Sequence, residues 1–87
     1  MKLRYHKNFS KQYKKLSVHQ KKKVDATILL FQKNPYHPLL KNHTLKGKRK
    51  DIQSISAGFD LRILFQEYNN YTYVIFLKVG SHNQVYS

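Results

Sequence analysis

The first third of the chain carries the pattern of two amphipathic helices. Phe9, Tyr13 and Leu16 fall at positions i, i+4 and i+7, so they share one face of a first helix. Ser17 and Gln20 then stand at the spacing of a capping box, which predicts that a second helix begins here. The same apolar face continues along this second helix at Val24, Thr27, Ile28 and Phe31.

Beyond residue 33 the pattern changes to one of strands and turns. Pro35 disfavours helical geometry at Asn34, so the helical hairpin is predicted to cover residues 7–33. A short strand is expected around residues 3–5 and a weaker one at residues 52–57. A tight turn at residues 67–70 joins two stronger strands, because asparagine tolerates positive φ. These stronger strands cover residues 61–65 and 71–79, and the second places on one side Tyr71, Tyr73, Ile75, Leu77 and Val79.

Together these elements predict an α+β fold, in which an N-terminal helical hairpin packs on one face of a small antiparallel β-sheet. With 87 residues the chain is expected to form one domain spanning residues 1–87. The helices cover one face of the sheet and leave the other partly open. That open face is therefore where a functional site is expected.

The charge of the chain points to a polyanionic partner. Seventeen Lys and Arg residues against four acidic residues give a net charge of +13, whereas solubility alone needs a net charge of only about 2–8. The bases are dense before the open face, at Lys41, Lys46, Lys48, Arg49 and Lys50. The last four predict a nucleic-acid-binding loop that contacts phosphates, and charge alone does not decide between RNA and DNA. No membrane association is expected, because no apolar run approaches the length of a bilayer span or a signal peptide, and we expect a cytoplasmic protein.

The histidines suggest a chemistry that such a basic surface could serve. When its own 2′-hydroxyl cleaves an RNA phosphodiester, a base, an acid and positive charge around phosphorus are needed, and imidazole suits both proton-transfer roles. His43 starts the basic loop and His82 follows a predicted strand, whereas His6, His19 and His37 are interpreted as surface or structural residues. The sequence lacks cysteine and has no cluster with metal-ligand spacing, so neither a metal nor a cofactor is predicted.

Three segments in register carry a resemblance to a known family. They are residues 42–47 (NHTLKG), 60–65 (DLRILF) and 79–86 (VGSHNQVY). In order and spacing they resemble the YafQ-like branch of the RelE/ParE toxin superfamily. This resemblance implies a RelE-like fold and a toxin of a type II toxin-antitoxin system that cleaves messenger RNA on the ribosome. It also implies a cognate acidic antitoxin as partner, and contact with DNA only through the antitoxin complex.

The resemblance also assigns roles to individual residues. It makes His43 and Asp60 candidates for base and orienting work, His82 the general acid, and Tyr86 an aromatic platform for an RNA base. Arg62 lies two residues beyond Asp60 in the predicted strand, where it could hold the scissile phosphate. The chain departs from the branch pattern at two positions: Ser56 stands where a further catalytic histidine is often found, and Leu61 replaces a bulky aromatic residue. The identity of the base is therefore left open, and a lysine of the basic loop could compensate.

Two other functions remain open at this point. A noncatalytic, ParE-like toxin would bind and inhibit a protein such as DNA gyrase. A simple basic RNA-binding domain would depend on charge but on no single histidine. The presence of both His43 and His82 favours the nuclease.

Overall fold

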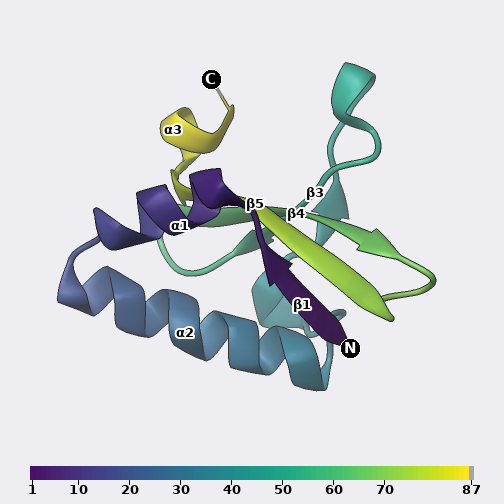
Figure 1. Ribbon diagram of the computed structural model, residues 1–87, viewed down its shortest axis with the longest axis horizontal. Coiled ribbons are helices and arrows are strands. Elements are labelled where there is room, and N and C mark those ends of the chain that lie inside the picture. The colour runs from purple at the N-terminus through teal and green to yellow at the C-terminus, as the bar shows by residue number, and fades with distance from the viewer. Residues whose placement is uncertain (87) are drawn as a thin grey trace.

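The computed structural model describes residues 1–86. They form three layers, and the middle layer is a five-stranded sheet (Figure 1). The helices α1 and α2 form one outer layer, and the C-terminal helix α3 and the loop before β3 rise from the opposite side of the sheet. In chain order the elements are β1 Lys2–Tyr5, α1 Lys7–Lys14, α2 Val18–Lys33, the 3₁₀ helix η1 Pro38–Leu40, β2 His43–Thr44, the 3₁₀ helix η2 Gly47–Arg49, β3 Gln53–Ser56, β4 Leu61–Tyr68, β5 Tyr73–Ser81 and α3 His82–Tyr86.

The helical hairpin agrees with the sequence prediction. The side chain of Ser17 accepts a hydrogen bond from the Gln20 backbone and that of Gln20 accepts one from the Ser17 backbone, so the capping box opens α2 as expected. The helix ends at Lys33, one residue before Asn34, whose extended backbone precedes Pro35. The apolar side chains Val24, Ile28 and Phe31 of α2 are buried against the sheet.

The sheet confirms the α+β prediction but is not wholly antiparallel. Its strand order is β1-β5-β4-β3-β2, and β1 pairs in parallel with β5. Only strands joined by a tight hairpin must run antiparallel. β1 and β5 are separated by most of the chain, so their connection allows either direction. In the hairpin between β4 and β5, residues 69–71 have positive φ, so the turn lies slightly later than predicted.

The buried side of β5 differs from the apolar side in the sequence prediction. Val74 and Phe76 are fully buried, whereas Tyr73 and Ile75 are only half-buried. An irregularity in the pairing with β4, between Leu64 and Phe65, then skips one residue of β5. Such a bulge shifts the alternation of the side chains, which explains why Val79 is buried although it has the opposite parity to Phe76.

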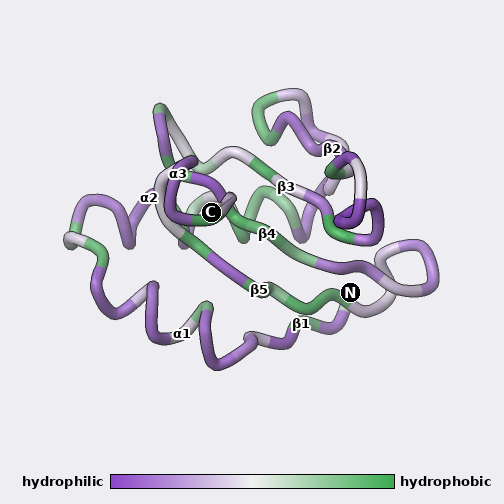
Figure 2. Tube along the Cα trace, turned by 90° about the horizontal axis from the view of Figure 1, so that it is seen from above, coloured by the Kyte–Doolittle hydropathy of each residue, from purple (hydrophilic) through white to green (hydrophobic). Residues whose placement is uncertain are grey.

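Aromatic rings form the centre of the core between the helices and the sheet. Phe31 of α2 meets Phe65 at 4.9 Å and Phe76 at 5.7 Å between ring centroids, and all three side chains are fully buried. Figure 2 shows that hydrophobic stretches concentrate in the central strands, whereas the helices alternate. Within residues 1–86 no helix has the length and apolarity needed to cross a membrane.

Candidate active site

The strand register places several predicted site residues on the face of the sheet opposite α2. His43 pairs with Ser54, Ser54 with Leu64, and Leu64 with Lys78, so these four form one row across the sheet. Side chains of directly paired residues point to the same face. In the next row, Arg62 pairs with Ser56 and with Gly80. His43 and Arg62 therefore lie on the same open face, one on the edge strand and one on a central strand.

The helix α3 covers part of this face and was not predicted from the sequence. The Ser81 hydroxyl accepts from the Gln84 backbone N–H at 3.2 Å, and the Gln84 side chain accepts from the Ser81 N–H at 2.8 Å. This is the same Ser-x-x-Gln pattern that opens α2, so the signal was present in the sequence. A Cβ atom at Gly80 would lie 2.7 Å from Gln84 Oε1, which explains why a residue without a side chain precedes the cap.

Asp60, His82 and Tyr86 meet at α3. The backbone N–H of His82 donates to the Asp60 carbonyl at 3.2 Å and reaches the Asp60 carboxylate at 3.4 Å. One turn later, the ring of Tyr86 lies against that of His82, with 4.4 Å between their centroids. Asp60 thus holds the start of α3 in place.

A buried serine anchors the other end of α3. The Tyr86 hydroxyl donates a hydrogen bond of 2.6 Å to the Ser54 hydroxyl, and Ser54 is fully buried. Val85 is also fully buried on this side. Ser54 lies on β3 and pairs with His43 of β2. This bond therefore brings the rings of His82 and Tyr86 to the strand next to the one that carries His43. Sequence reasoning missed Ser54, since a single serine in a strand carries no signal.

We expect Tyr86→Phe to lower stability although the ring is kept. The substitution leaves the Ser54 hydroxyl buried without its partner, which costs about 1–3 kcal/mol. In the double variant Ser54→Ala, Tyr86→Phe, most of that loss should be recovered. Urea unfolding of the single and double variants measures the coupling between the two side chains. Equal stability of Tyr86→Phe and the unmodified chain would show that the bond contributes nothing.

His43 is held in one tautomer by its neighbour. Its Nδ1 atom lies 2.8 Å from the carbonyl oxygen of Lys41. A carbonyl oxygen can only accept, so Nδ1 carries the proton in the neutral ring and Nε2 has the free lone pair. Lys41 adopts positive φ at this position. The exposed ring of His43 can therefore take up a proton at Nε2.

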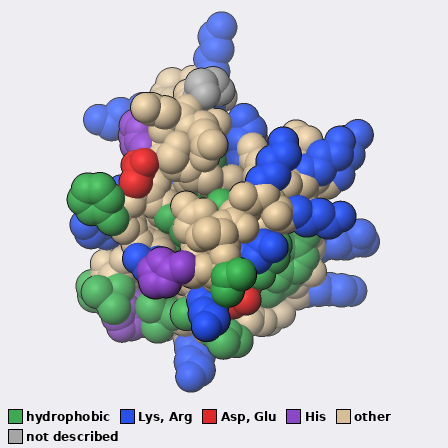
Figure 3. Space-filling view, turned by 90° about the vertical axis from the view of Figure 1, so that its left-hand side faces the viewer, with side chains coloured by type: hydrophobic (Ala, Val, Ile, Leu, Met, Phe, Trp, Pro, Cys, Tyr) green, Lys and Arg blue, Asp and Glu red, His purple; other side chains and the backbone are tan. Residues whose placement is uncertain are grey.

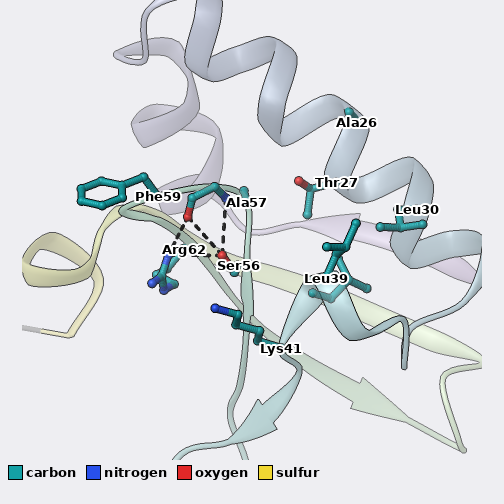
Figure 4. A pocket seen from close by; sticks show the side chains of 11 residues that line it. Ala26, Thr27, Leu30, Leu39, Lys41, Ser56, Ala57, Phe59 and Arg62 are labelled. Carbon is teal, nitrogen blue, oxygen red and sulfur yellow. Dashed lines mark hydrogen bonds between the residues drawn. The ribbon is translucent and has the colours of Figure 1, made fainter.

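Arg62 is fixed at the turn between β3 and β4. Its Nη1 atom donates to the Gly58 carbonyl at 3.0 Å and to the Ser56 hydroxyl at 3.3 Å (Figure 4). Ser56 thus helps to orient the guanidinium group. Arg62 and Lys41 also border a cavity of about 540 Å³ between α2, η1 and this turn, whose other walls are largely apolar.

The basic loop stands beside α3 on the same side of the sheet. Lys46, Lys48 and Lys50 are exposed, whereas Arg49 is half-buried and its Nη1 atom reaches the backbone carbonyl of Tyr86 at 3.5 Å. Arg49 therefore lies at the end of α3, next to Tyr86. Figure 3 shows the face that lies on the left in Figure 1. Lys and Arg side chains project around the rim of this face, and few Asp and Glu side chains are visible on it.

Of the remaining histidines, two accept a hydrogen bond at the start of a helix and one is exposed on the surface. Nδ1 of His6 accepts from the Asn8 N–H at the start of α1, and Nδ1 of His37 accepts from the Leu39 N–H at the start of η1. His19 is exposed on α2. Within residues 1–86, no group of three or more His, Cys, Asp and Glu side chains is arranged to hold a metal ion.

Comparison with known proteins adds a family match to this geometry. The model of the family described as "Bacterial toxin of type II toxin-antitoxin system, YafQ" matches residues 1–87. None of the curated proteins matches the chain.

Solved structures share the fold over almost the whole chain. A YoeB/ParE toxin from Agrobacterium tumefaciens has a TM-score of 0.78 at 18% identity and covers 94% of this chain and 99% of its own. YafQ from E. coli strain BL21(DE3) has a TM-score of 0.77 at 20% identity, with 98% and 97% covered. The E. coli DinJ-YafQ complex gives a TM-score of 0.71 at 20% identity, with 98% and 97% covered.

Proposed function

Because the chain belongs to the YafQ family of toxins from type II toxin-antitoxin systems, we propose that it is an endoribonuclease that cleaves messenger RNA on the ribosome in the cytoplasm. The observation that carries this proposal is the convergence of His43, Arg62, His82 and Tyr86 on one face of the sheet. Ser54 and Asp60 connect His43, His82 and Tyr86 through hydrogen bonds, strand pairing and ring contact. Strand pairing puts Arg62 on the same face. A protein that acted only by binding would not need two histidines and an arginine on the same exposed surface.

The proposed reaction uses the 2′-hydroxyl of the RNA as nucleophile. Nε2 of His43 accepts the proton of this hydroxyl as its oxygen bonds to phosphorus. The guanidinium group of Arg62 stabilises the negative charge that develops on the phosphoryl oxygens. The bond from phosphorus to the 5′-oxygen then breaks, and His82 donates a proton to that oxygen. The products are a 2′,3′-cyclic phosphate and a 5′-hydroxyl end, and the proposed steps require no metal.

Inducible expression of the chain, followed by mapping of messenger-RNA 5′ ends, tests this function. We expect growth arrest and new 5′-hydroxyl ends within translated reading frames. These ends should be absent from cells that express His82→Ala at the same level. Growth arrest without new RNA ends would overturn the nuclease and would favour a toxin that inhibits a protein such as DNA gyrase.

We also infer that an acidic antitoxin covers the basic surface of this chain. The related E. coli YafQ is found in a complex with DinJ, and the net charge of +13 favours an acidic partner. Attraction between opposite charges accelerates association and is screened by salt. The rate constant of association with the co-expressed antitoxin should therefore fall markedly between low and physiological salt in stopped-flow measurements. A rate that does not depend on salt would contradict this role of the charge.

A further inference from the structure

One aromatic side chain stands entirely in solvent beside the candidate site. Phe59 is 98% exposed, whereas the next most exposed large hydrophobic side chains within residues 1–86, Leu39 and Val18, are 72% and 71% exposed. A phenyl ring has no polar atom that gains from contact with water, so full exposure carries a cost in the free chain. The ring contributes nothing to the core, so its whole surface is available to a ligand.

The turn that carries Phe59 is fixed rather than loose. The Ala57 N–H donates to the Leu61 carbonyl at 2.8 Å, which closes the turn. Gly58 provides a positive φ of 136°, and its carbonyl accepts from both Arg62 and the Ser56 hydroxyl. A rigid turn that holds an aromatic ring outward presents a preformed binding surface, because little conformational entropy is lost on binding. In Figure 4 the ring points away from the turn and from the neighbouring cavity.

Two hollows border Phe59. One is the largely apolar cavity of about 540 Å³ beside Arg62. The other, on the side of α3, is a hollow of about 250 Å³ whose lining residues are mostly polar or charged: His19, Gln20, Lys23, Asp60, Leu61, Ser81 and Gln84. A nucleic acid base suits this mixture, because it has a π-face for stacking and polar edges. The side chain of Lys23 runs close to Gly58, so a cation stands next to the turn that carries the aromatic ring. Aromatic rings flanked by cations are typical of surfaces that bind single-stranded nucleic acid, where bases stack on the ring.

We propose that Phe59 stacks on a base of the bound RNA, next to the nucleotide that is cleaved. This proposal rests on the proposed nuclease function, and it adds a second aromatic platform to that of Tyr86. Asp60 follows Phe59 in sequence and contacts the His82 backbone, and the Tyr86 ring contacts the His82 ring. Both platforms therefore lie near the proposed general acid.

The absence of tryptophan from the sequence allows a direct test. Phe59→Trp introduces a single tryptophan, whose fluorescence is quenched when a base stacks on it. The probe is a single-stranded RNA oligonucleotide of about ten nucleotides, comparable to the site size of single-strand binding folds, with 2′-O-methyl groups that prevent cleavage. Leu29→Trp provides the control, because Leu29 is also exposed but stands on α2 and borders neither hollow beside Phe59. We expect quenching at position 59 and little at position 29. Equal quenching at both positions, or none at position 59, would overturn the proposal.

Cleavage measurements separate an aromatic requirement from a merely apolar one. Stacking of one base corresponds to about a 5-fold to 150-fold effect on binding. For cleavage of ribosome-bound messenger RNA, kcat/KM of Phe59→Ala and of Phe59→Leu should be lower by a factor in this range, because KM rises. Phe59→Trp should keep the kcat/KM of the unmodified chain. The proposal would be overturned if Phe59→Leu cleaved RNA as well as the unmodified chain. It would also be overturned if a Phe59 variant cleaved normally and differed only in no longer being inhibited by the antitoxin. If the unmodified chain cleaved no RNA while position 59 was still quenched, the nuclease would fail and base stacking would stand.

Discussion

Replacing His82 with alanine is expected to lower the rate of messenger-RNA cleavage by about 10²–10⁴, because a positioned general acid contributes this much. The side chain of His82 is exposed and contacts the Tyr86 ring, whereas its hydrogen bonds to Asp60 use the backbone N–H. The variant should therefore fold normally. Cleavage kinetics on ribosomes programmed with a defined message, together with a thermal unfolding curve, measure both properties.

His6→Ala is a suitable control for this experiment. The imidazole of His6 accepts the Asn8 N–H at the start of α1, so its loss should lower stability by about 0.5–2 kcal/mol, as removal of a helix cap does. It lies on α1's side of the molecule and should leave the cleavage rate unchanged. Activity and stability would then respond to different histidines. A folded His82→Ala variant that cleaves at the normal rate would exclude His82 from the chemistry.

The sequence predicted the parts of the fold that have a long or strong local signal. The face of α2 spans several turns, so its periodicity was visible, and the capping box at Ser17 marked its start. β2 has only two residues and α3 only five, which is too short for periodicity to be detected. The pairing of β1 with β5 joins distant segments, so no local pattern could give its direction.

The buried face of β5 shows a different limit. Alternation along β5 pointed to Ile75 and Leu77, but the core takes Val74 and Phe76. Both sides of this strand are apolar, so the pattern alone cannot say which side faces α2. The pairing irregularity beside Leu64 then reverses the parity toward Val79. Burial on both sides of a central strand and a bulge within it are decided by packing, which the local sequence does not encode.

The candidate site was predicted as residues but not as an arrangement. Resemblance to a family selected His43, Asp60, Arg62, His82 and Tyr86, and the structure places them around the same open face. The resemblance did not indicate Ser54 or Phe59, because neither lies in the three segments, residues 42–47, 60–65 and 79–86, that carry it. Ser54 became visible through its bond to Tyr86, and Phe59 through its exposure. Contacts and exposure are properties of the folded chain, which explains why the sequence alone missed them.

The second large effect is expected at Arg62. Arg62→Gln removes the positive charge that the proposed mechanism aims at the phosphoryl oxygens, and loss of one such group typically costs about 10²–10³ in kcat. Arg62→Lys keeps the charge but cannot reproduce the planar group that meets both the Ser56 hydroxyl and the Gly58 carbonyl. We therefore expect Arg62→Lys to be intermediate. Single-turnover cleavage on programmed ribosomes separates this loss in rate from weaker binding.

Two further variants separate a cation that stabilises the reacting phosphate from a cation that only helps to bind RNA. Lys48→Gln removes a base from the exposed loop. For single-stranded RNA, removing one cation that neutralises a phosphate flattens the dependence of log affinity on log salt by about 0.7. The variant should therefore weaken binding, most at low salt, and leave the rate of the bound complex unchanged. Ser56→Ala keeps the charge of Arg62 but removes one of the groups that orient it, so its kcat should fall less than that of Arg62→Gln.

The salt dependence of Arg62→Gln decides whether this arginine acts in chemistry or in docking. If it behaved like Lys48→Gln, with a changed salt dependence and a normal single-turnover rate, Arg62 would act in docking. Another cation would then have to stabilise the transition state. Arg49, which reaches the Tyr86 carbonyl, would be the first to replace, since it is the loop cation that is half-buried at the site.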